Sequence, residues 1–317
     1  MLLNIVITIA GFVILIKSAD YFVGGAASFA KNFKIPTIVI GLTIVAFATS
    51  APELAISFSS HLSGNADMVF GNVFGSSISN ILMILGLAVV IRPFNIEGDV
   101  IKNQIPILLL ITAGVSVMFL DSLFYPGEIN TLSRSEGIML ILFFTIFVFY
   151  LIVILKNSDK TKESEPPQYK TLISALLMVL GLAGIIWSSD LVVDNAAIIA
   201  EGIGVSQKII SVTIISVGTS LPELITTITA AKKGENGMAI GNIVGSNIFN
   251  IAIVLGLPIA TLGGISTTAF GIVDVLYMFL AVLALWIFSA INRDLRRYEG
   301  GILIVIYATY VIYIFVQ

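Results

Sequence analysis

Long apolar stretches alternate with short polar segments along the whole chain. Ten of these stretches have the length of a membrane-spanning helix, near the roughly 20 residues that a bilayer requires. They fall near 2–30, 36–60, 67–91, 103–120, 134–156, 170–200, 208–232, 237–262, 266–290 and 299–315. The first and the sixth are long, so we expect them to be tilted or to extend past the bilayer. The pattern predicts an all-α membrane protein with ten transmembrane helices.

One polar segment divides the chain. Residues 157–169, NSDKTKESEPPQY, are charged and contain two prolines. The segment predicts a linker between a first repeat of five spans, residues 1–156, and a second repeat of five spans, residues 170–317. The N-terminal stretch lacks a basic region and a small-residue cleavage site, so we interpret it as the first span and not as a removable signal.

The two halves contain the same polar interruptions. Residues 41–87 align without a gap to residues 211–257, and 19 of the 47 aligned positions are identical. The offset is 170 residues throughout, and it also relates Asp20 to Asp190. Duplicated membrane halves with matching polar interruptions are typical of transporters whose site lies between the repeats.

Each repeat places a glutamate directly after a proline inside an apolar span. The segments read TSAPE at 49–53 and TSLPE at 219–223. Proline lacks an N–H and frees the carbonyl four residues earlier, so we expect a broken helix near the midplane in each repeat. The spacing also places the threonine, serine and glutamate of each segment on one helical face.

A polar stripe follows on the next span of each half. It recurs every fourth residue and consists of Asn72, Ser76 and Asn80, and of Asn242, Ser246 and Asn250. Glycines beside the stripes, at 71, 75, 241 and 245, are expected to allow close helix approach. For the serines and the last asparagine of each stripe we favour ion ligation, because the stripe runs beside the broken span. For the first asparagine, ligation and packing are equally open.

Composition supports a membrane protein with many spans. Of 317 residues, 57% are hydrophobic and 11% are charged, whereas a soluble domain carries about 25% charged residues. There is no cysteine, which excludes disulfides and thiolate metal sites, and the single His61 excludes histidine clusters. The net charge of −3 gives no indication of a nucleic-acid partner. The expected partner is the lipid bilayer, and no obligatory protein partner is evident.

The basic residues predict an orientation. If the central linker is cytoplasmic, thirteen of the sixteen lysines and arginines lie on that side, with only Arg134 and Lys208 outside and Lys17 within the first span. Such an excess marks the cytoplasmic face, which places both termini outside the cell membrane. Because five spans per half is an odd number, the second repeat must be inverted. We therefore expect Glu53 and Glu223 to face each other near the midplane.

All the polar groups that the two repeats gather present oxygen. Hard cations such as Ca²⁺ take about six to eight oxygen ligands, and one divalent cation balances the charge of two glutamates. Two bare carboxylates in the bilayer would cost on the order of 3 kcal/mol each, so the site should always hold a cation or protons. This property suits an exchanger, because an empty, charged carrier resists reorientation.

At these residues the chain resembles the cation/calcium exchanger superfamily, and above all its prokaryotic sodium/calcium exchangers. The resemblance rests on ATSAPEL at 48–54, GNVFGSSISN at 71–80, GTSLPEL at 218–224 and GNIVGSNIFN at 241–250. These motifs are similar to the family's two alpha-repeats in order, spacing and inverted placement. The ten-span layout extends the match over essentially the whole chain.

The resemblance implies an antiporter that exchanges Ca²⁺ against Na⁺ by alternating access, with both ions as substrates and no cofactor. It implies a site formed by spans two, three, seven and eight, with Glu53 and Glu223 as the central calcium-binding acids. The family's other coordinating positions fall on Thr49, Ser50, Ser76, Asn80, Thr219, Ser220, Ser246 and Asn250, and on the backbone carbonyls of Ala46 and Ser216. Spans one and six correspond to the helices that move in the family.

Two residues depart from the family pattern. Ala48 replaces the usual glycine of the first GTS motif, which should stiffen the break without removing a ligand. Asn250 stands where some relatives, including potassium-dependent ones, carry an aspartate. The asparagine argues against potassium cotransport and leaves the pocket with a charge of −2. It also leaves the sodium stoichiometry open. The short linker also leaves no room for the large calcium-sensing region of animal exchangers.

Several alternatives compete with this prediction. A proton/calcium antiporter of the same superfamily would use the glutamates as proton carriers, although the additional hydroxyl, amide and carbonyl oxygens suit Na⁺ better. A channel is a second alternative, but channels usually draw selectivity from rings of repeated subunits, whereas an inverted internal pair fits a carrier. An intramembrane zinc protease would need HExxH, which one histidine cannot supply. Nothing around Asp20 and Asp190 suggests catalysis, so we do not expect an enzyme.

Individual residues also have purely structural interpretations. A buried glutamate can be a neutral hydrogen-bonding group, although two at equivalent positions beside prolines make this less favoured. For Asp20 and Asp190, a helix-end or interface role is at least as well supported as ion funnelling. His61 ends the second span and is expected to be a loop residue.

Overall fold

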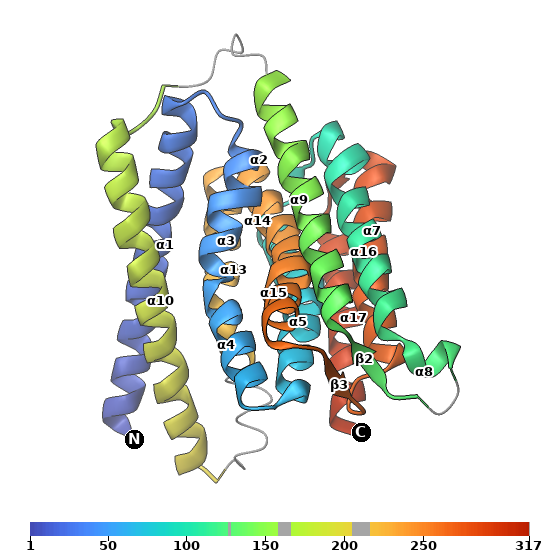
Figure 1. Ribbon diagram of the computed structural model, residues 1–317. Coiled ribbons are helices and arrows are strands. Elements are labelled where there is room, and N and C mark those ends of the chain that lie inside the picture. The colour runs from blue at the N-terminus through green and yellow to red at the C-terminus, as the bar shows by residue number, and fades with distance from the viewer. Residues whose placement is uncertain (126–127, 158–165, 205–215, 317) are drawn as a thin grey trace.

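Helices of membrane-spanning length run side by side through the molecule (Figure 1). The computed structural model describes residues 1–125, 128–157, 166–204 and 216–316, without the side chains of Asn157, Ser216, Val217 and Asn292. In this part, eight helices are long and apolar enough to cross a membrane, and the pair Thr37–Thr49 and Ala51–Leu62, bent by 44°, can count as a ninth. The predicted span 208–232 and the predicted linker 157–169 lie partly outside the described residues, so the count of ten stays a prediction.

The elements of the first half come first in the chain, and η denotes a π-helix. They are α1 (Leu2–Asn32), α2 (Thr37–Ile40), η1 (Gly41–Val45), α3 (Ala46–Thr49), α4 (Ala51–Leu62), α5 (Ala66–Ser79), η2 (Asn80–Leu85), α6 (Gly86–Ile91), β1 (Phe94–Asn95), η3 (Val100–Gln104), α7 (Ile105–Phe119), α8 (Asp121–Phe124), β2 (Asn130–Leu132) and α9 (Arg134–Asn157).

The second half repeats this order with small differences. Its elements are α10 (Thr171–Gly202), α12 (Ser216–Thr219), α13 (Leu221–Lys233), α14 (Asn236–Phe249), η5 (Asn250–Leu255), α15 (Gly256–Leu262), β3 (Ile265–Thr267), α16 (Ile272–Asn292), β4 (Asp294–Leu295) and α17 (Arg297–Val316). Most ends agree with the predicted spans within three or four residues. The predicted start of span 266–290 is wrong by six residues, because residues 265–267 form β3 and α16 begins only at Ile272.

Both predicted helix breaks are confirmed. α3 ends and α4 begins at Ser50, with φ −89° and ψ 7°, and α12 and α13 are separated at Ser220, with φ −90° and ψ 4°. The prolines at 52 and 222 fall in the first turn of α4 and α13. A missing N–H is tolerated there, because the first N–H groups of a helix have no intrahelical partner. Each glutamate therefore sits in the first turn of a new helix.

Two long helical segments form the centre of the molecule. Of the residues in their most apolar windows, 72% are buried in Ala66–Ile91 and 83% in Asn236–Leu262, against 17% in α1. The second segment, Asn236–Leu262, approaches α2 and η1 very closely. A Cβ on Gly241 would lie 2.7 Å from the carbonyl oxygen of Ile38, and one on Gly245 would lie 2.7 Å from that of Leu42. The expected role in close helix approach is confirmed for Gly241 and Gly245. It is wrong for Gly71 and Gly75, because a Cβ on Gly71 would meet only the ring of Phe270 and one on Gly75 nothing within 4 Å.

The first and sixth spans, α1 and α10, form a separate antiparallel pair at the left of Figure 1. A Cβ on Gly11 would lie 2.8 Å from Cγ2 of Val192, and a Cβ on Gly181 would lie 2.7 Å from the backbone nitrogen of Phe22. Residues 11 and 181, and residues 22 and 192, are related by the offset of 170. The same contact therefore occurs twice in this pair, once from each half.

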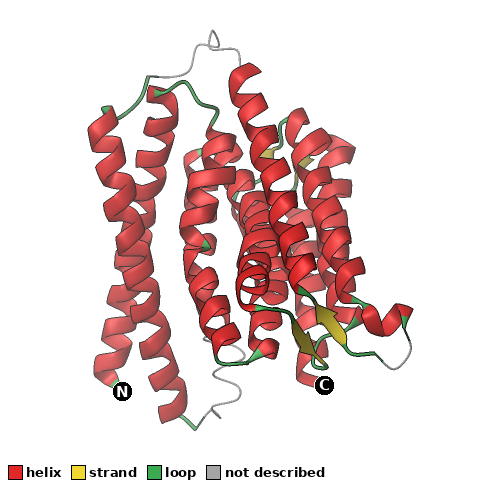
Figure 2. Ribbon diagram, viewed as in Figure 1, coloured by secondary structure: helices red, strands yellow, loops and turns green. Residues whose placement is uncertain are grey.

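Two short antiparallel sheets join the halves at opposite ends of the molecule (Figure 2). In one, Phe94 of β1 pairs with Leu295 of β4. In the other, Thr131 of β2 pairs with Ser266 of β3. Each sheet joins the loop after the third span of one half to the loop before the last span of the other. The all-helical prediction missed these strands because two or three residues carry no recognisable period.

Candidate ion-binding site

The two repeat glutamates lie inside the protein. Glu53 and Glu223 are each 1% exposed, in the first turns of α4 and α13. Ser50, three residues before Glu53, contacts Glu223, so the two acids belong to one buried region. The N-terminus of a helix carries partial positive charge that favours a carboxylate in the first turn. The helix breaks at Ser50 and Ser220 place such an N-terminus beneath each acid in the interior of the bundle.

Residues of one half complete the site of the other. The Ser50 hydroxyl donates a hydrogen bond to Oε1 of Glu223 at 3.0 Å. The Thr49 hydroxyl lies 3.3 Å from Oδ1 of Asn242 and 3.4 Å from the carbonyl oxygen of Ala46, and can donate to either. The contacts of Ser50 with Glu223 and of Thr49 with Asn242 link the broken second span to elements about 170 or more residues away in sequence. The site is therefore shared between the halves.

The first asparagine of each stripe ties its own span to the neighbouring broken span. Nδ2 of Asn72 donates to the carbonyl oxygen of Glu53 at 2.9 Å and to Oγ of Ser57 at 3.0 Å. Nδ2 of Asn242 donates to Oγ1 of Thr227 at 2.9 Å. These bonds give the amide nitrogens of Asn72 and Asn242 a positioning role. Of the two roles left open by the sequence, ion ligation and packing, the nitrogens therefore serve packing.

Sequence reasoning missed the partners of these asparagines. Ser57 and Thr227 are fully buried and related by the same offset of 170. Each follows its glutamate by four residues, so it lies one helical turn further along the same face. In the alignment of residues 41–87 with residues 211–257, a search for positions with serine in one half and threonine in the other would have found the pair.

The last asparagine of each stripe begins a π-helix. Asn80 is the first residue of η2 and Asn250 the first residue of η5. They are 1% and 0% exposed, and neither amide atom of either residue has a hydrogen-bond partner in the described structure. π-helical turns are frequent at functional sites, because the wider turn displaces a side chain from the regular helix face. Sequence analysis found the residues but not the π-helices.

The remaining stripe serines are also enclosed. Ser76 is 5% exposed and Ser246 is fully buried. The hydroxyl oxygen of Ser246 has no partner among the described residues. Both serines lie one helical turn before the asparagine that opens the π-helix, as the spacing of four predicts.

Unpartnered buried atoms concentrate on the predicted residues. The described structure holds sixteen buried side-chain nitrogen and oxygen atoms without a hydrogen-bond partner. Eight of them belong to five of the predicted site residues, Glu53, Asn80, Glu223, Ser246 and Asn250. Buried polar groups are nearly always hydrogen-bonded, and exceptions call for a water, an ion or a functional reason. This arrangement can supply an oxygen-lined cation site.

The other predicted residues lie at the two helix breaks. Ser220 is 2% exposed, and Thr219 ends α12. The Ala46 carbonyl already accepts the Ser50 N–H at 3.0 Å, so a cation there would compete with the Thr49 hydroxyl for the remaining lone pair. Ser216 begins α12, but its side chain is outside the described part, and nothing tests the role expected for its carbonyl.

Asp20, the first of the two other acids that the repeat relates, forms an ion pair between helices. Nζ of Lys233 lies 2.9 Å from Oδ1 of Asp20, whose side chain is 51% exposed. Asp20 therefore has the interface role that the sequence left open. In the described ranges, no cluster of three or more His, Cys, Asp or Glu residues could hold a metal. A cation bound at the two glutamates must take its other ligands from neutral oxygens.

Comparisons with known proteins agree with this geometry. The family model described as "Sodium/calcium exchanger protein" matches residues 3–153 and 173–316. The chain is 39% identical to "Inner membrane protein YrbG" of Escherichia coli (strain K12) over 81% of the chain and 80% of that protein. It is 37% identical to "Putative antiporter CaxA" of Alkalimonas amylolytica, with 98% of each covered. A solved structure of the sodium-calcium exchanger NCX_Mj is similar at a TM-score of 0.83 and 28% identity, covering 98% of both chains.

Proposed function

The chain belongs to the sodium/calcium exchanger family, and from this premise we propose that it is an antiporter that exchanges Ca²⁺ against Na⁺. Membership makes it a transporter and not an enzyme. The observation that carries the proposal is the group of eight unpartnered buried polar atoms on Glu53, Asn80, Glu223, Ser246 and Asn250. The names of a putative antiporter and of a sodium-calcium exchanger among similar proteins support it.

The proposed calcium ligands are the two carboxylates with neutral oxygens around them. Glu53 and Glu223 supply the charge of −2 that one Ca²⁺ balances, and the stripe residues supply the remaining oxygens, from Ser76, Asn80, Ser246 and Asn250. Ca²⁺ accepts such mixed sets of carboxylate, amide and other oxygens. The proposed sodium ligands lie at the helix breaks and are Thr49, Ser50, Thr219, Ser220 and the carbonyls of Ala46 and Ser216.

The hydrogen bond from Ser50 to Glu223 suits an exchange site. It satisfies one oxygen of Glu223 when no cation is bound there. When a cation arrives, the hydroxyl can rotate and present its own oxygen, because a serine hydroxyl both donates and accepts. Two carboxylates without a counter-ion remain costly in the membrane. This cost links the exit of one ion to the entry of another.

The proposed architecture is ten transmembrane helices in two inverted repeats of five. It is supported by the antiparallel course of α1 and α10, in which Gly11 contacts Val192 as Gly181 contacts Phe22. It is also supported by the two sheets, which join equivalent loops at opposite ends of the molecule. The distribution of lysine and arginine favours a cytoplasmic linker and external termini.

A proton/calcium antiporter is the second candidate. The names of YrbG and CaxA do not state a coupling ion, and two buried glutamates can carry protons. The hydroxyl and amide oxygens around them favour Na⁺, because proton transfer at a carboxylate needs no such cage of neutral ligands.

Uptake of ⁴⁵Ca²⁺ into proteoliposomes separates these candidates. One arm has an outward Na⁺ gradient, and the other has an outward H⁺ gradient at equal Na⁺ on both sides. We expect uptake in the Na⁺ arm only. Uptake driven only by H⁺ would retain the two glutamates and reassign the coupling ion, and uptake in neither arm would contradict calcium exchange. Empty liposomes are the control for leakage.

A further inference from the structure

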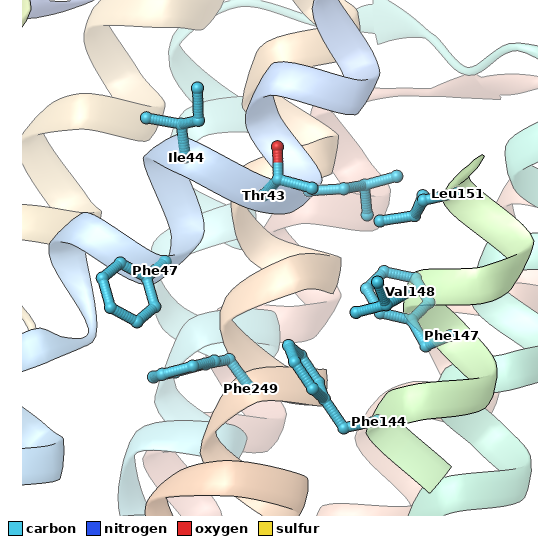
Figure 3. A pocket seen from close by; sticks show the side chains of 9 residues that line it. Thr43, Ile44, Phe47, Phe144, Phe147, Val148, Leu151 and Phe249 are labelled. Carbon is cyan, nitrogen blue, oxygen red and sulfur yellow. The ribbon is translucent and has the colours of Figure 1, made fainter. Parts of the chain in front are cut away.

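An apolar pocket with a volume of about 360 Å³ is lined by residues that are neighbours of site residues in the sequence but are not site residues themselves (Figure 3). It is formed by the start of the second span, by α9 and by α14. Phe47, Phe144, Phe147, Val148 and Phe249 form most of its wall. The rings of Phe47 and Phe249 meet edge to face at 5.1 Å, and those of Phe144 and Phe249 at 5.9 Å.

The pocket offers nothing to a polar ligand. Thr43 is the only lining residue with a polar side chain, and its hydroxyl already donates to the carbonyl oxygen of Val39 at 2.6 Å. Apolar cavities do not hold ordered water, because water needs several polar partners. The occupant must therefore be a hydrocarbon.

The pocket is accessible from the side of the helix bundle. Phe47 is 56% exposed, Ile44 38% and Val148 36%. All three residues belong to the interior of membrane-spanning segments, and Val148 lies more than two turns from either end of α9. At that depth the surrounding medium is lipid, so the hydrocarbon that reaches the pocket comes from the bilayer.

Basic residues lie where the headgroup of such a lipid would be. Lys156 follows the lining residue Leu151 by five residues, which is about 8 Å along α9. Lys34 lies at the same end of the molecule, in the connection between α1 and α2 (Figure 1). Lysines at the membrane boundary attract lipid phosphate. We propose that this pocket binds an acyl chain of a phospholipid whose phosphate lies at the level of Lys156 and Lys34.

The pocket is not a by-product of the duplication. The positions equivalent to Phe47 and Phe249 in the other half are Val217 and Ser79. The fifth spans are related by a different offset, because Gly137 contacts Gly256 as Gly300 contacts Gly86, so Phe144 corresponds to Tyr307. The edge-to-face pair of Phe47 and Phe249 therefore belongs to one half only. Phe249 directly precedes Asn250, and Phe47 lies two residues before Thr49. The bound acyl chain therefore packs against both segments that carry site residues.

Photolabelling tests the proposal. The full chain is reconstituted with a phosphatidylglycerol that carries a diazirine in its acyl chain, irradiated, and mapped by mass spectrometry. We expect adducts on the pocket residues to exceed, several-fold, those on Ile146 and Phe149, which are 62% and 67% exposed on other faces of α9. Labelling in proportion to exposure would overturn the proposal, because it would indicate only the general lipid shell.

Two filling variants complete the test. Val148→Trp and the milder Leu151→Phe place additional side-chain volume in the pocket, and Ile146→Trp is the matched control on the lipid-facing surface. We expect both filling variants to remove the excess labelling and the control to retain it, with size-exclusion profiles showing that each variant is folded. Unchanged labelling in both filling variants would contradict the proposal. Labelling does not depend on ion transport, so this result stands apart from the outcome of the calcium uptake experiment.

Discussion

At the scale of single residues, the candidate site depends on oxygens held in place from the opposite half of the chain. Ser50 donates to Glu223, and Thr49 is within hydrogen-bonding distance of Asn242. Hydrogen bonds to a charged acceptor are worth about 1.5–3 kcal/mol, which is enough to orient a carboxylate before a cation arrives. The carboxylates themselves carry the charge on which cation binding depends.

Glu53→Gln and Glu223→Gln test this charge directly. Each replacement keeps the shape of the side chain and removes one unit of negative charge from a buried site. Removing one partner of a buried pair of opposite charges, here the carboxylate that faces the cation, costs about 2–5 kcal/mol. We therefore expect ⁴⁵Ca²⁺ exchange to fall by about 100-fold or more. The exposed Glu128→Gln is the matched control and should exchange normally. Normal exchange by either site variant, in a folded protein, would refute the proposed site.

At the scale of elements, close contact between α14 and η1 holds the two halves of the site together. Gly241 and Gly245 allow the backbone of α14 to approach η1 and α2 to within contact distance of their carbonyl oxygens. The π-helix η5 follows directly and begins at Asn250. The position of the polar stripe therefore depends on two glycines that carry no chemistry of their own.

Gly245→Ala is the corresponding prediction. Its Cβ would lie 2.7 Å from the Leu42 carbonyl oxygen, so α14 must shift. Overpacking of this kind costs about 1–3 kcal/mol, and we expect a lower melting temperature in detergent together with weaker calcium exchange. The matched control is Gly301→Ala in α17, where a Cβ meets nothing within 4 Å and the higher helix propensity of alanine should leave stability equal or slightly raised. Equal melting temperatures of the two variants would show that the close approach is not important for stability.

At the scale of the whole molecule, equivalent features of the two halves lie at opposite ends. β1 pairs with β4 at one end and β2 pairs with β3 at the other, as Figure 2 shows. With the linker in the cytoplasm, the loop that contains Glu97 faces inward and the loop that contains Glu128 faces outward. This arrangement is what a two-fold axis in the membrane plane requires.

Single cysteines can test this orientation, because the chain has no cysteine of its own. In intact cells, a membrane-impermeant maleimide should label Glu128→Cys at once and Glu97→Cys only after the membrane is opened. The unsubstituted chain is the background control. Labelling of both variants from the outside would contradict loops on opposite faces, and the reverse pattern would invert the proposed orientation while retaining the repeats.

The sequence by itself determined the features that depend on local composition and spacing. Apolar runs located most spans to within a few residues, and the prolines at 52 and 222 located the helix breaks, because a missing N–H acts within one turn. The repeat also identified the two buried glutamates and the asparagines 80 and 250, because two copies of a polar interruption in an apolar span indicate a shared role.

Only the tertiary structure decided which of these groups meet. The bond from Ser50 to Glu223 and the pairing of β3 with β2 join the two halves of the chain, and the bond from Asn72 to Ser57 joins two different helices. The π-helices that begin at Asn80 and Asn250 also appear only in the structure. The aromatic pocket beside Phe249 likewise exists only because three spans converge there. Spacing along one helix predicts which residues share a face, but it carries no information about the face that lies opposite.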